Sequence, residues 1–191
     1  YNPKMHIAIV GGGIGGLTLA LSLHQAGLPC RVYEAAPAWK ALGLGINLLP
    51  HAMRELTELG LGAALERAAI ATQEAVYCNR FGQLIRREPR GRAAGYAWPQ
   101  LSIHRADLHA VLAAAVGDAL ALGAKCVAVE QDADGVMLKF EDGGNARADA
   151  AIGCDGIHSV VRKTLHQAEG PLSYQGIHMW RGVTRARPFL T

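Results

Sequence analysis

The chain has 191 residues and a net charge of +3, with half of its residues hydrophobic and 18% charged. This length suffices for one domain with a full core and part of another, and the composition excludes an intrinsically disordered protein. The basic stretch Ile85–Arg92 has no interleaved aromatic residues, so we interpret it as a solvated loop, not a nucleic-acid surface.

The first predicted strand, His6–Val10, leads into a glycine-rich turn. Gly11, Gly13 and Gly16 fall at GxGxxG spacing, which suits a tight turn, an approach of pyrophosphate to bare backbone, and close helix packing. The following helix, expected at Ile14–Ala26, would direct its free N–H groups and positive dipole end at the phosphates. The predicted nucleotide contacts of this loop are Gly11, Gly13, Ile14, Gly15 and Gly16.

A second apolar strand, Cys30–Tyr33, ends at an acid, Glu34. An acid at this place in a βαβ unit accepts hydrogen bonds from the adenosine ribose hydroxyls. A bare GxGxxG also occurs by chance, but strand, loop, helix, strand and acid in register predict a dinucleotide site.

The rest of the chain alternates between helical and strand patterns. We expect helices at His51–Leu59, Leu61–Ala69 and Arg105–Leu122, a hairpin of Glu74–Asn79 and Leu84–Glu88, and later strands at Lys125–Gln131, Val136–Phe140 and Ala150–Cys154. We predict that the last strand joins His6–Val10 and Cys30–Tyr33 in one mostly parallel sheet, because all three are short, apolar and followed by ligand-binding candidates.

Arg105 is unusual because it begins its helix, where a positive charge opposes the helix dipole. Either Asp107 in the same turn offsets this charge locally, or Arg105 binds an anion such as a dinucleotide pyrophosphate. We interpret the neighbouring His104 as a packing residue.

The segment Asp155–Arg162 follows a strand and therefore leaves the sheet at its carboxyl edge, where open α/β sheets bind ligands. Asp155 could hydrogen-bond neighbouring backbone or a ribose, Gly156 permits a corner with positive φ, and Ser159 is a candidate N-cap. Taken alone, the segment could equally be an ordinary strand-to-helix turn.

The four cysteines occur singly, without CxxC or zinc spacing. No apolar run approaches the roughly 18 residues of a membrane span, and the first strand leaves no room for a signal peptide. We therefore expect reduced, buried thiols in a cytoplasmic protein without a metal site.

Together, Gly11–Gly16, Glu34, Arg105 and "GCDGIHSVVR" (Gly153–Arg162) resemble the signature set of class A FAD-dependent monooxygenases, the para-hydroxybenzoate hydroxylase family. The stretches "EPRG", "SIHRADL" and "GIHMWRGVTRA" are similar in particular to the phenazine-carboxylate monooxygenase branch. The likeness covers nearly all of Met5–Leu190.

The resemblance implies an α/β, Rossmann-like FAD-binding fold with a parallel sheet, an inserted β-hairpin and a β-meander. It places the FAD-binding domain at residues 5–170 and the start of a substrate-domain sheet at 171–191, with a strand from Gln175 to Val183. The family's third motif, a Gly-Asp strand end, is not found in the sequence. We therefore expect the chain to be the N-terminal part of a longer enzyme, and the sequence leaves open whether this part is active by itself.

The resemblance also implies the chemistry. NAD(P)H reduces FAD, the reduced flavin forms a C4a-hydroperoxide with dioxygen, and an aromatic substrate is hydroxylated, so no catalytic side chain is required. Backbone groups of Gly43–Asn47, with Gly45 and Ile46 foremost, would line the flavin, and Val127 and Asp155 complete the candidate FAD contacts. Trp180 and Arg181 are interpreted as an amphipathic packing pair, with pocket lining as the alternative.

Three other functions would use part of the same motifs. A disulfide reductase would need a redox cysteine pair soon after Glu34, and the sequence has none there. A plain NAD-dependent dehydrogenase would leave Arg105 and the Asp-Gly segment unexplained. A non-catalytic nucleotide-binding fragment, or a differently acting FAD/NAD oxidoreductase, is the remaining alternative to the monooxygenase.

Overall fold

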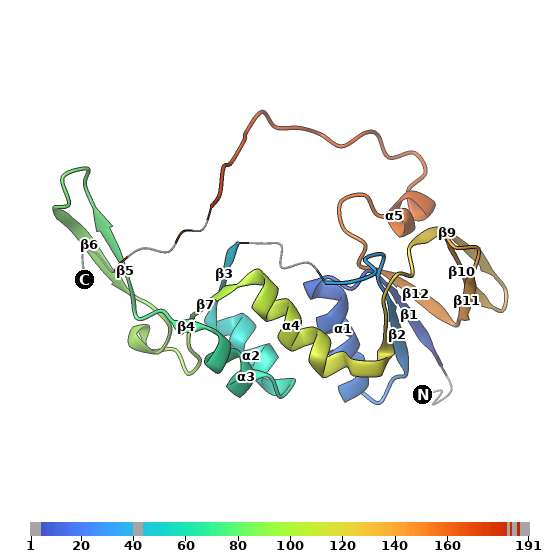
Figure 1. Cartoon of the computed structure of the whole chain (residues 1–191), viewed down its shortest axis with the longest axis horizontal. Coiled ribbons are helices and arrows are strands. Elements are labelled where there is room, and N and C mark those ends of the chain that lie inside the picture. Colours follow the sequence, from blue (N-terminus) through green and yellow to red (C-terminus); the bar gives the residue numbers. More distant parts are fainter. Residues whose placement is uncertain (1–4, 40–43, 183, 185–186, 188–191) are drawn as a thin grey trace. The chain divides into compact units, whose positions relative to one another are not determined.

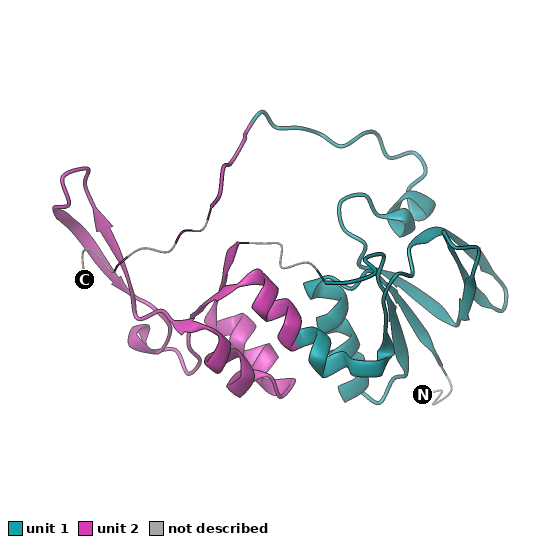
Figure 2. Cartoon of the chain, in the orientation of Figure 1, with its two compact units in different colours: residues 1–40, 112–176 teal, residues 41–111, 177–191 magenta. Residues whose placement is uncertain are grey.

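The computed structural model describes residues 5–39, 44–182, 184 and 187. The chain forms two compact units (Figure 2): unit 1 comprises Tyr1–Lys40 and Leu112–Gly176, and unit 2 comprises Ala41–Val111 and Ile177–Thr191. None of the described helices is both long and apolar enough to cross a membrane.

Unit 1 is built on a four-stranded parallel sheet in the order β12-β1-β2-β8 (Figure 1). The strands are β1 (Ile7–Val10), β2 (Cys30–Tyr33), β8 (Leu120–Ala121) and β12 (Ala150–Gly153). Ile7 pairs with Cys30 on one side and with Ala150 on the other. The prediction that these three distant strands are neighbours in one parallel sheet is therefore confirmed.

Both faces of β1 are covered, which explains why all four of its residues are buried. Helix α1 (Ile14–Gln25) contacts β1 and β2 and buries Leu17 and Ala20. On the opposite face, Ala8 and Val10 share a core cluster with Cys126, Leu138, Ala148 and Val161. That cluster joins the sheet to the antiparallel meander β9 (Cys126–Asp132), β10 (Gly135–Phe140) and β11 (Asn145–Ala148), and to helix α5 (Val160–Leu165).

Unit 2 contains a small antiparallel sheet in the order β3-β7-β4. Its strands are β3 (Gly45–Leu48), β4 (Ile70–Ala71) and β7 (Leu101–His104), and helices α2 (Pro50–Glu58) and α3 (Gly62–Ala68) lie between β3 and β4 in the chain. A hairpin of β5 (Glu74–Cys78) and β6 (Leu84–Pro89) is followed by the 3-10 helix η1 (Gly91–Ala94). The chain passes from unit 2 into unit 1 within helix α4 (Arg105–Val116).

The structure corrects several expected boundaries. Helix α4 was expected to reach Leu122, but it ends at Val116 because Gly117 adopts a positive φ of 59°, and a 3-10 turn η2 (Gly117–Ala119) follows. The next two residues form β8, which pairs with β2. A strand was expected from Gln175, but the described residues 175–182 form no strand and pair with none of the described strands.

Candidate functional site

The glycine-rich loop follows β1 at the edge where β1, β2 and β12 all end. Gly11 has a φ of 105°, and a Cβ there would lie 2.3 Å from the carbonyl oxygen of Cys154. A Cβ on Gly16 would lie 2.0 Å from the carbonyl oxygen of Gly11. These two positions therefore exclude any larger residue, as the tight turn and the close helix packing predicted from the sequence require.

Gly13 and Gly15 have the opposite surroundings. A Cβ on either residue would meet no atom within 4 Å, so the loop here borders open space. Gly13 is the N-cap of α1 in an extended conformation, and no side chain caps the helix. The first N–H groups of α1 thus lie beside a backbone surface onto which an anionic group could fit.

Glu34 is held against this loop by two hydrogen bonds. Its Oε2 accepts a hydrogen bond from the Gly12 N–H at 2.6 Å, and its Oε1 accepts one from the Ala36 N–H at 2.8 Å. A carboxylate has further lone pairs, so the Glu34 oxygens could still accept ribose hydroxyls. Sequence reasoning missed Gly12, where a Cβ would lie 2.9 Å from the Glu34 Cβ; the run of three glycines at Gly11–Gly13 was the available signal.

Asp155 lies just after β12, which is joined to β1 by a hydrogen bond from the Cys154 N–H to the Val10 carbonyl oxygen at 2.7 Å. Its Oδ2 accepts a hydrogen bond from the Val160 N–H at 2.6 Å, and its Oδ1 accepts one from the Ser159 hydroxyl at 2.5 Å. Ser159 Oγ accepts the Arg162 N–H, so Ser159 is the N-cap that the sequence predicted. Gly156 has a φ of 76°, also as predicted.

Burial changes the pKa of the Cys154 thiol, which precedes Asp155. Desolvation raises the pKa of the Cys154 thiol above its ordinary value, and the charge of Asp155 adds to the increase. The Cys126 thiol has its pKa raised mainly by burial too. Both thiols are therefore held in the neutral form, which suits packing and not nucleophilic chemistry.

In unit 2, the structure brings together three of the predicted cofactor residues: Gly45, Ile46 and Arg105. Gly45 pairs with His104 across the β3–β7 ladder, and the Arg105 N–H donates to the Leu44 carbonyl oxygen at 2.9 Å. An Arg181 guanidinium N–H donates to the Gly45 carbonyl oxygen at 3.2 Å. Gly43, the first residue of the predicted flavin-lining stretch, lies outside the described residues.

The Arg105 side chain is exposed, and it forms no ion pair with Asp107 or with any other acid in the described ranges. Asp107 lies in the first turn of α4, where its negative charge interacts favourably with the helix dipole without an ion pair to Arg105. His104 Nδ1 accepts the Ala106 N–H at 3.3 Å, so this histidine caps the start of α4.

Val127 and Trp180, which the sequence analysis also singled out, are both exposed. Val127 lies on β9 with 46% of its surface exposed, while its neighbour Cys126 enters the core. Trp180 is 96% exposed, so the interpretation of Trp180 and Arg181 as a packing pair is wrong for the described part of the chain.

The protein family described as "FAD binding domain" matches residues 4–187. The chain belongs to this family. Its relatives include phenazine 1,6-dicarboxylic acid hydroxylase PhzS of Lysobacter antibioticus, which is 40% identical over 96% of this chain and 48% of its own length. The 3-amino-4-hydroxybenzoate 2-monooxygenase of Streptomyces cremeus is also 40% identical, over 95% of this chain and 47% of its own length.

Solved structures agree with the family assignment. The structure of Klebsiella pneumoniae HpxO complexed with FAD and uric acid superposes with a TM-score of 0.76 at 29% identity, covering 86% of this chain and 42% of that one. The fold is thus the Rossmann-like FAD-binding fold expected from the sequence. The chain spans about half the length of the curated relatives that it matches.

Proposed function

We propose that this chain is the FAD-binding part of a flavin-dependent monooxygenase that hydroxylates an aromatic substrate with NAD(P)H and dioxygen. The observation that carries the proposal is the glycine loop at the end of β1, with open backbone at Gly13 and Gly15 and with Glu34 fixed beside it by the Gly12 N–H. Such a loop, helix start and acid are the parts that bind the pyrophosphate and ribose of a dinucleotide.

In this proposal, the residues of unit 1 bind the adenosine half of FAD. The backbone N–H groups from Gly13 to Gly16 approach the pyrophosphate, and Glu34 accepts hydrogen bonds from the ribose hydroxyls. Asp155 keeps the turn after β12 in place by accepting hydrogen bonds at the start of α5. Val127, which is exposed on β9, belongs to the same proposed set.

We assign contacts to the flavin and ribityl half of the cofactor to Gly45, Ile46 and Arg105. The open side of Gly45, where a Cβ would meet no atom within 4 Å, gives a backbone surface for the flavin or ribityl chain, with Ile46 next to it. Arg105 is exposed without an acidic partner in the described ranges and supplies positive charge for the pyrophosphate or the ribityl oxygens. Residues 5–170 would then be the FAD-binding domain, and residues 171–191 the start of a substrate-binding domain.

When bound, FAD supplies the redox chemistry, because it accepts a hydride from NAD(P)H and then activates dioxygen. The chain's own task is to bind and orient the cofactor and to keep water from the reacting groups. An aromatic substrate is supported by the names of the relatives, which are hydroxylases or monooxygenases of phenazine, benzoate, nicotinate and salicylate compounds. The free, singly placed cysteines support a reducing compartment such as the cytoplasm.

The test uses the protein at its natural length. After gel filtration, we expect flavin absorbance to co-elute with the protein, and we expect an aromatic acid such as salicylate or 6-hydroxynicotinate to stimulate NAD(P)H oxidation and to gain one oxygen atom. A protein that retains no flavin would contradict the proposal. NAD(P)H oxidation that no aromatic compound stimulates would favour a differently acting flavin oxidoreductase.

A further inference from the structure

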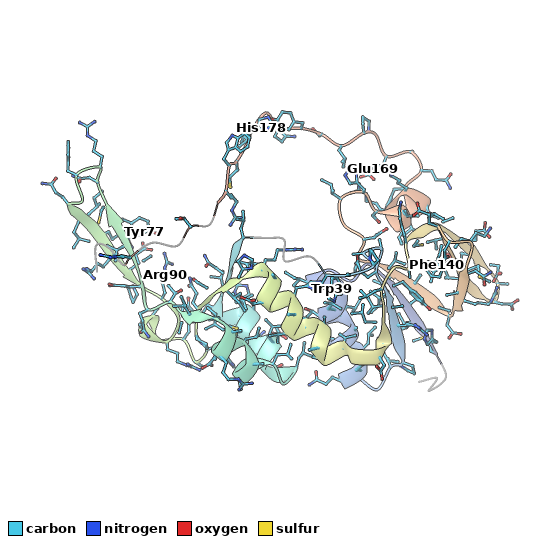
Figure 3. The ribbon with its side chains drawn as sticks, viewed as in Figure 1. Trp39, Tyr77, Arg90, Phe140, Glu169 and His178 are labelled. Carbon is cyan, nitrogen blue, oxygen red and sulfur yellow. The ribbon has the colours of Figure 1, made fainter. Side chains whose placement is uncertain are left out.

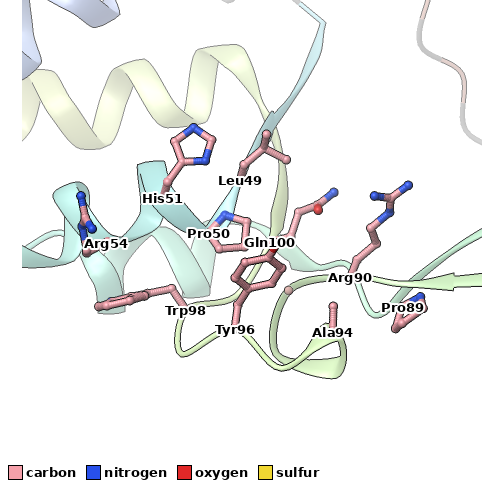
Figure 4. Close-up of a pocket in the computed structure, with 11 residues that line it drawn as sticks. Leu49, Pro50, His51, Arg54, Pro89, Arg90, Ala94, Tyr96, Trp98 and Gln100 are labelled. Carbon is pink, nitrogen blue, oxygen red and sulfur yellow. The ribbon is translucent and has the colours of Figure 1, made fainter.

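A pocket of about 490 Å³ lies within unit 2 and is lined by residues of that unit alone. It lies between the start of α2 and the segment that runs from the end of β6 through η1 to β7, and its chemically distinctive lining residues are His51, Arg54, Arg90, Tyr96, Trp98 and Gln100. Its volume falls in the range of roughly 300–1,000 Å³ that is usual for small-molecule sites. Figure 4 shows Arg54 and Trp98 at one side of the pocket and Arg90 at the other, with Tyr96 between them.

The lining is positively charged. It includes two arginines and one histidine but no aspartate or glutamate. Arg54 pairs with Glu55 outside the pocket lining, and both side chains are about half exposed, at 50% and 56%, so this pair is easily exchanged for another anion.

Arg90 also gives the pocket positive charge, because it shares its acidic partner with another arginine. The Arg90 Nη2 group donates hydrogen bonds to Glu88 at 2.6 Å and to the Tyr77 hydroxyl at 3.2 Å. Arg90 and Tyr77 are labelled in Figure 3. Glu88 also pairs with Arg86 at 2.8 Å. Because two guanidinium groups share one carboxylate, the end of β6 carries a net positive charge next to the pocket.

The uncharged lining favours a flat ligand. Tyr96 and Trp98 present ring faces or edges, and Pro50 adds an apolar surface at the start of α2. Aromatic rings pack against other rings with a preference for offset or edge-to-face geometry. The Gln100 amide, which can both donate and accept a hydrogen bond, provides a further polar contact.

We propose that this pocket is a binding site for a small aromatic carboxylate, whose carboxylate is bound by Arg54 or Arg90 and whose ring packs on Tyr96 and Trp98. A guanidinium binds a carboxylate or a phosphate with two parallel hydrogen bonds, and a neutral amide lacks the charge that strengthens them. The rings of Tyr96 and Trp98 favour an aromatic carboxylate over inorganic phosphate, because only the former has a ring to pack on them. The proposal goes beyond the FAD assignment and does not depend on it, because all of its residues lie in unit 2 outside the predicted cofactor contacts.

The experiment is calorimetric titration of the natural-length protein with salicylate, and with salicylamide as an uncharged ligand of the same shape. We expect salicylate to bind and salicylamide to bind at least tenfold more weakly. Arg54→Gln or Arg90→Gln should weaken salicylate binding about tenfold or more, since each removes a charged hydrogen-bond donor. Glu88 retains Arg86 in the second variant, so that substitution does not leave the carboxylate without a partner.

Arg92→Gln is the matched control, because Arg92 lies in η1 and pairs with Glu66 but does not line the pocket. This variant should bind salicylate like the wild type. Titrations of the FAD-free and FAD-loaded protein should give the same affinity, which separates this pocket from a substrate site beside the cofactor. The proposal is overturned by equal binding of salicylamide, by unchanged affinity in both pocket variants, by inorganic phosphate displacing salicylate at equal concentration, or by binding only when FAD is present.

Discussion

At the residue scale, Glu34 follows β2 and is held in position by the glycine loop. Its two oxygens accept the N–H groups of Gly12 and Ala36, so the carboxylate cannot rotate away from the end of β2 without losing both bonds. A carboxylate that is fixed in advance loses little conformational freedom when a ribose binds. The same negative charge repels a 2′-phosphate, so we do not expect NADP to replace FAD in this site.

Glu34→Ala should weaken FAD binding by the natural-length protein by roughly ten- to a hundredfold. The reason is that hydrogen bonds to a charged group contribute about 1.5–3 kcal/mol. FAD affinity is measured by flavin fluorescence, together with the midpoint of thermal unfolding, because the variant also loses the bonds to Gly12 and Ala36. Glu130→Ala, which removes an exposed acid paired with Lys139, is the control and should leave affinity unchanged. An unaltered affinity in Glu34→Ala would remove Glu34 from the site.

Arg105→Ala should weaken FAD binding to a similar degree, but in a way that depends on salt. Arg105 is exposed, and raised ionic strength screens exposed charges, so the difference between wild type and variant should shrink between about 0.05 and 0.5 M salt. The measurement is the FAD dissociation constant at both salt concentrations. Arg147→Ala, which removes an exposed arginine paired with Asp132, is the matched control. If Arg105→Ala binds FAD as the wild type does, the charge at the start of α4 has no part in cofactor binding.

Two glycines of the loop should respond differently to the same substitution. Gly11→Ala forces a Cβ into the Cys154 carbonyl at a positive φ, so we expect the free energy of unfolding to fall by about 1–3 kcal/mol. Gly13→Ala adds a methyl group in open space at a φ of −69°, so the fold should keep its stability while FAD affinity falls. Chemical denaturation and FAD titration of both variants separate the two effects. Equal loss of stability in both would contradict this assignment of the two glycines.

At the scale of elements, the turn after β12 depends on Asp155 as the cap of a very short helix. The helix α5 has six residues, and helices of this length are not stable by themselves. Its first N–H groups are bound by Asp155 and Ser159 instead of by water. The core contact of Val161 with the meander then fixes α5 on unit 1.

Asp155→Ala should therefore loosen α5 before it affects the sheet. We expect a loss of about 0.5–2 kcal/mol, the usual range for removal of a capping side chain. Amide hydrogen exchange should accelerate at residues 160–165 and stay slow in β1. Asp142→Ala, which removes an acid that binds the Gly144 N–H in a turn of the meander, is the control and should leave exchange in α5 as in the wild type. Exchange that accelerates equally in β1 would show that Asp155 supports the whole sheet.

Several elements could be predicted from the sequence because their signals are local. The strands β1 and β2 and the start of α1 follow from apolar runs, glycine spacing and the loop between them. The strands β3, β4 and β7 were missed because each has four residues or fewer and is defined by pairing, as in Gly45 opposite His104, across a long sequence separation. The early end of α4 had a local signal in Gly117, which adopts a positive φ, but the strand β8 after it is defined by its pairing with β2 and could not be predicted from the helical periodicity.

The candidate site shows the same division. Gly11, Gly16 and Glu34 could be identified from spacing, because each position follows from the geometry of one turn. The pocket residues Tyr96 and Trp98 gave no signal, since they lie in a loop without periodicity and become neighbours of Arg54 only through the fold. The expected strand from Gln175 failed because a strand needs a partner, which the sequence pattern by itself does not reveal.

At the scale of the whole molecule, the buried thiols give the protein a dependence on alkaline pH. Burial raises the pKa of Cys30, Cys126 and Cys154 in the folded state. A raised thiol pKa means that the folded state holds its protons more firmly than the unfolded state. The stability that these thiols contribute is therefore fully present below the ordinary thiol pKa and is lost as the pH rises through the higher folded-state values.

We thus expect the free energy of unfolding to be flat around neutral pH and to fall as the pH rises above about 8.5, the ordinary thiol value. Urea denaturation at a series of pH values measures this. Iodoacetamide labelling followed by peptide mass spectrometry should show the buried Cys30 and Cys126 thiols reacting far more slowly in the folded protein than in urea. Labelling at the same rate in both states would show that the thiols are not buried.

The pairing of β1 with strands on both of its sides has a consequence for synthesis on the ribosome. One neighbour, β2, is translated soon after β1, but the other, β12, ends only at Gly153. At a translation rate of roughly 5–20 residues per second, β1 waits on the order of ten seconds with one edge unpaired and one face uncovered by the meander. An apolar strand exposed for that time is a binding site for a ribosome-associated chaperone, so the nascent chain should depend on such assistance until residue 153 has left the exit tunnel.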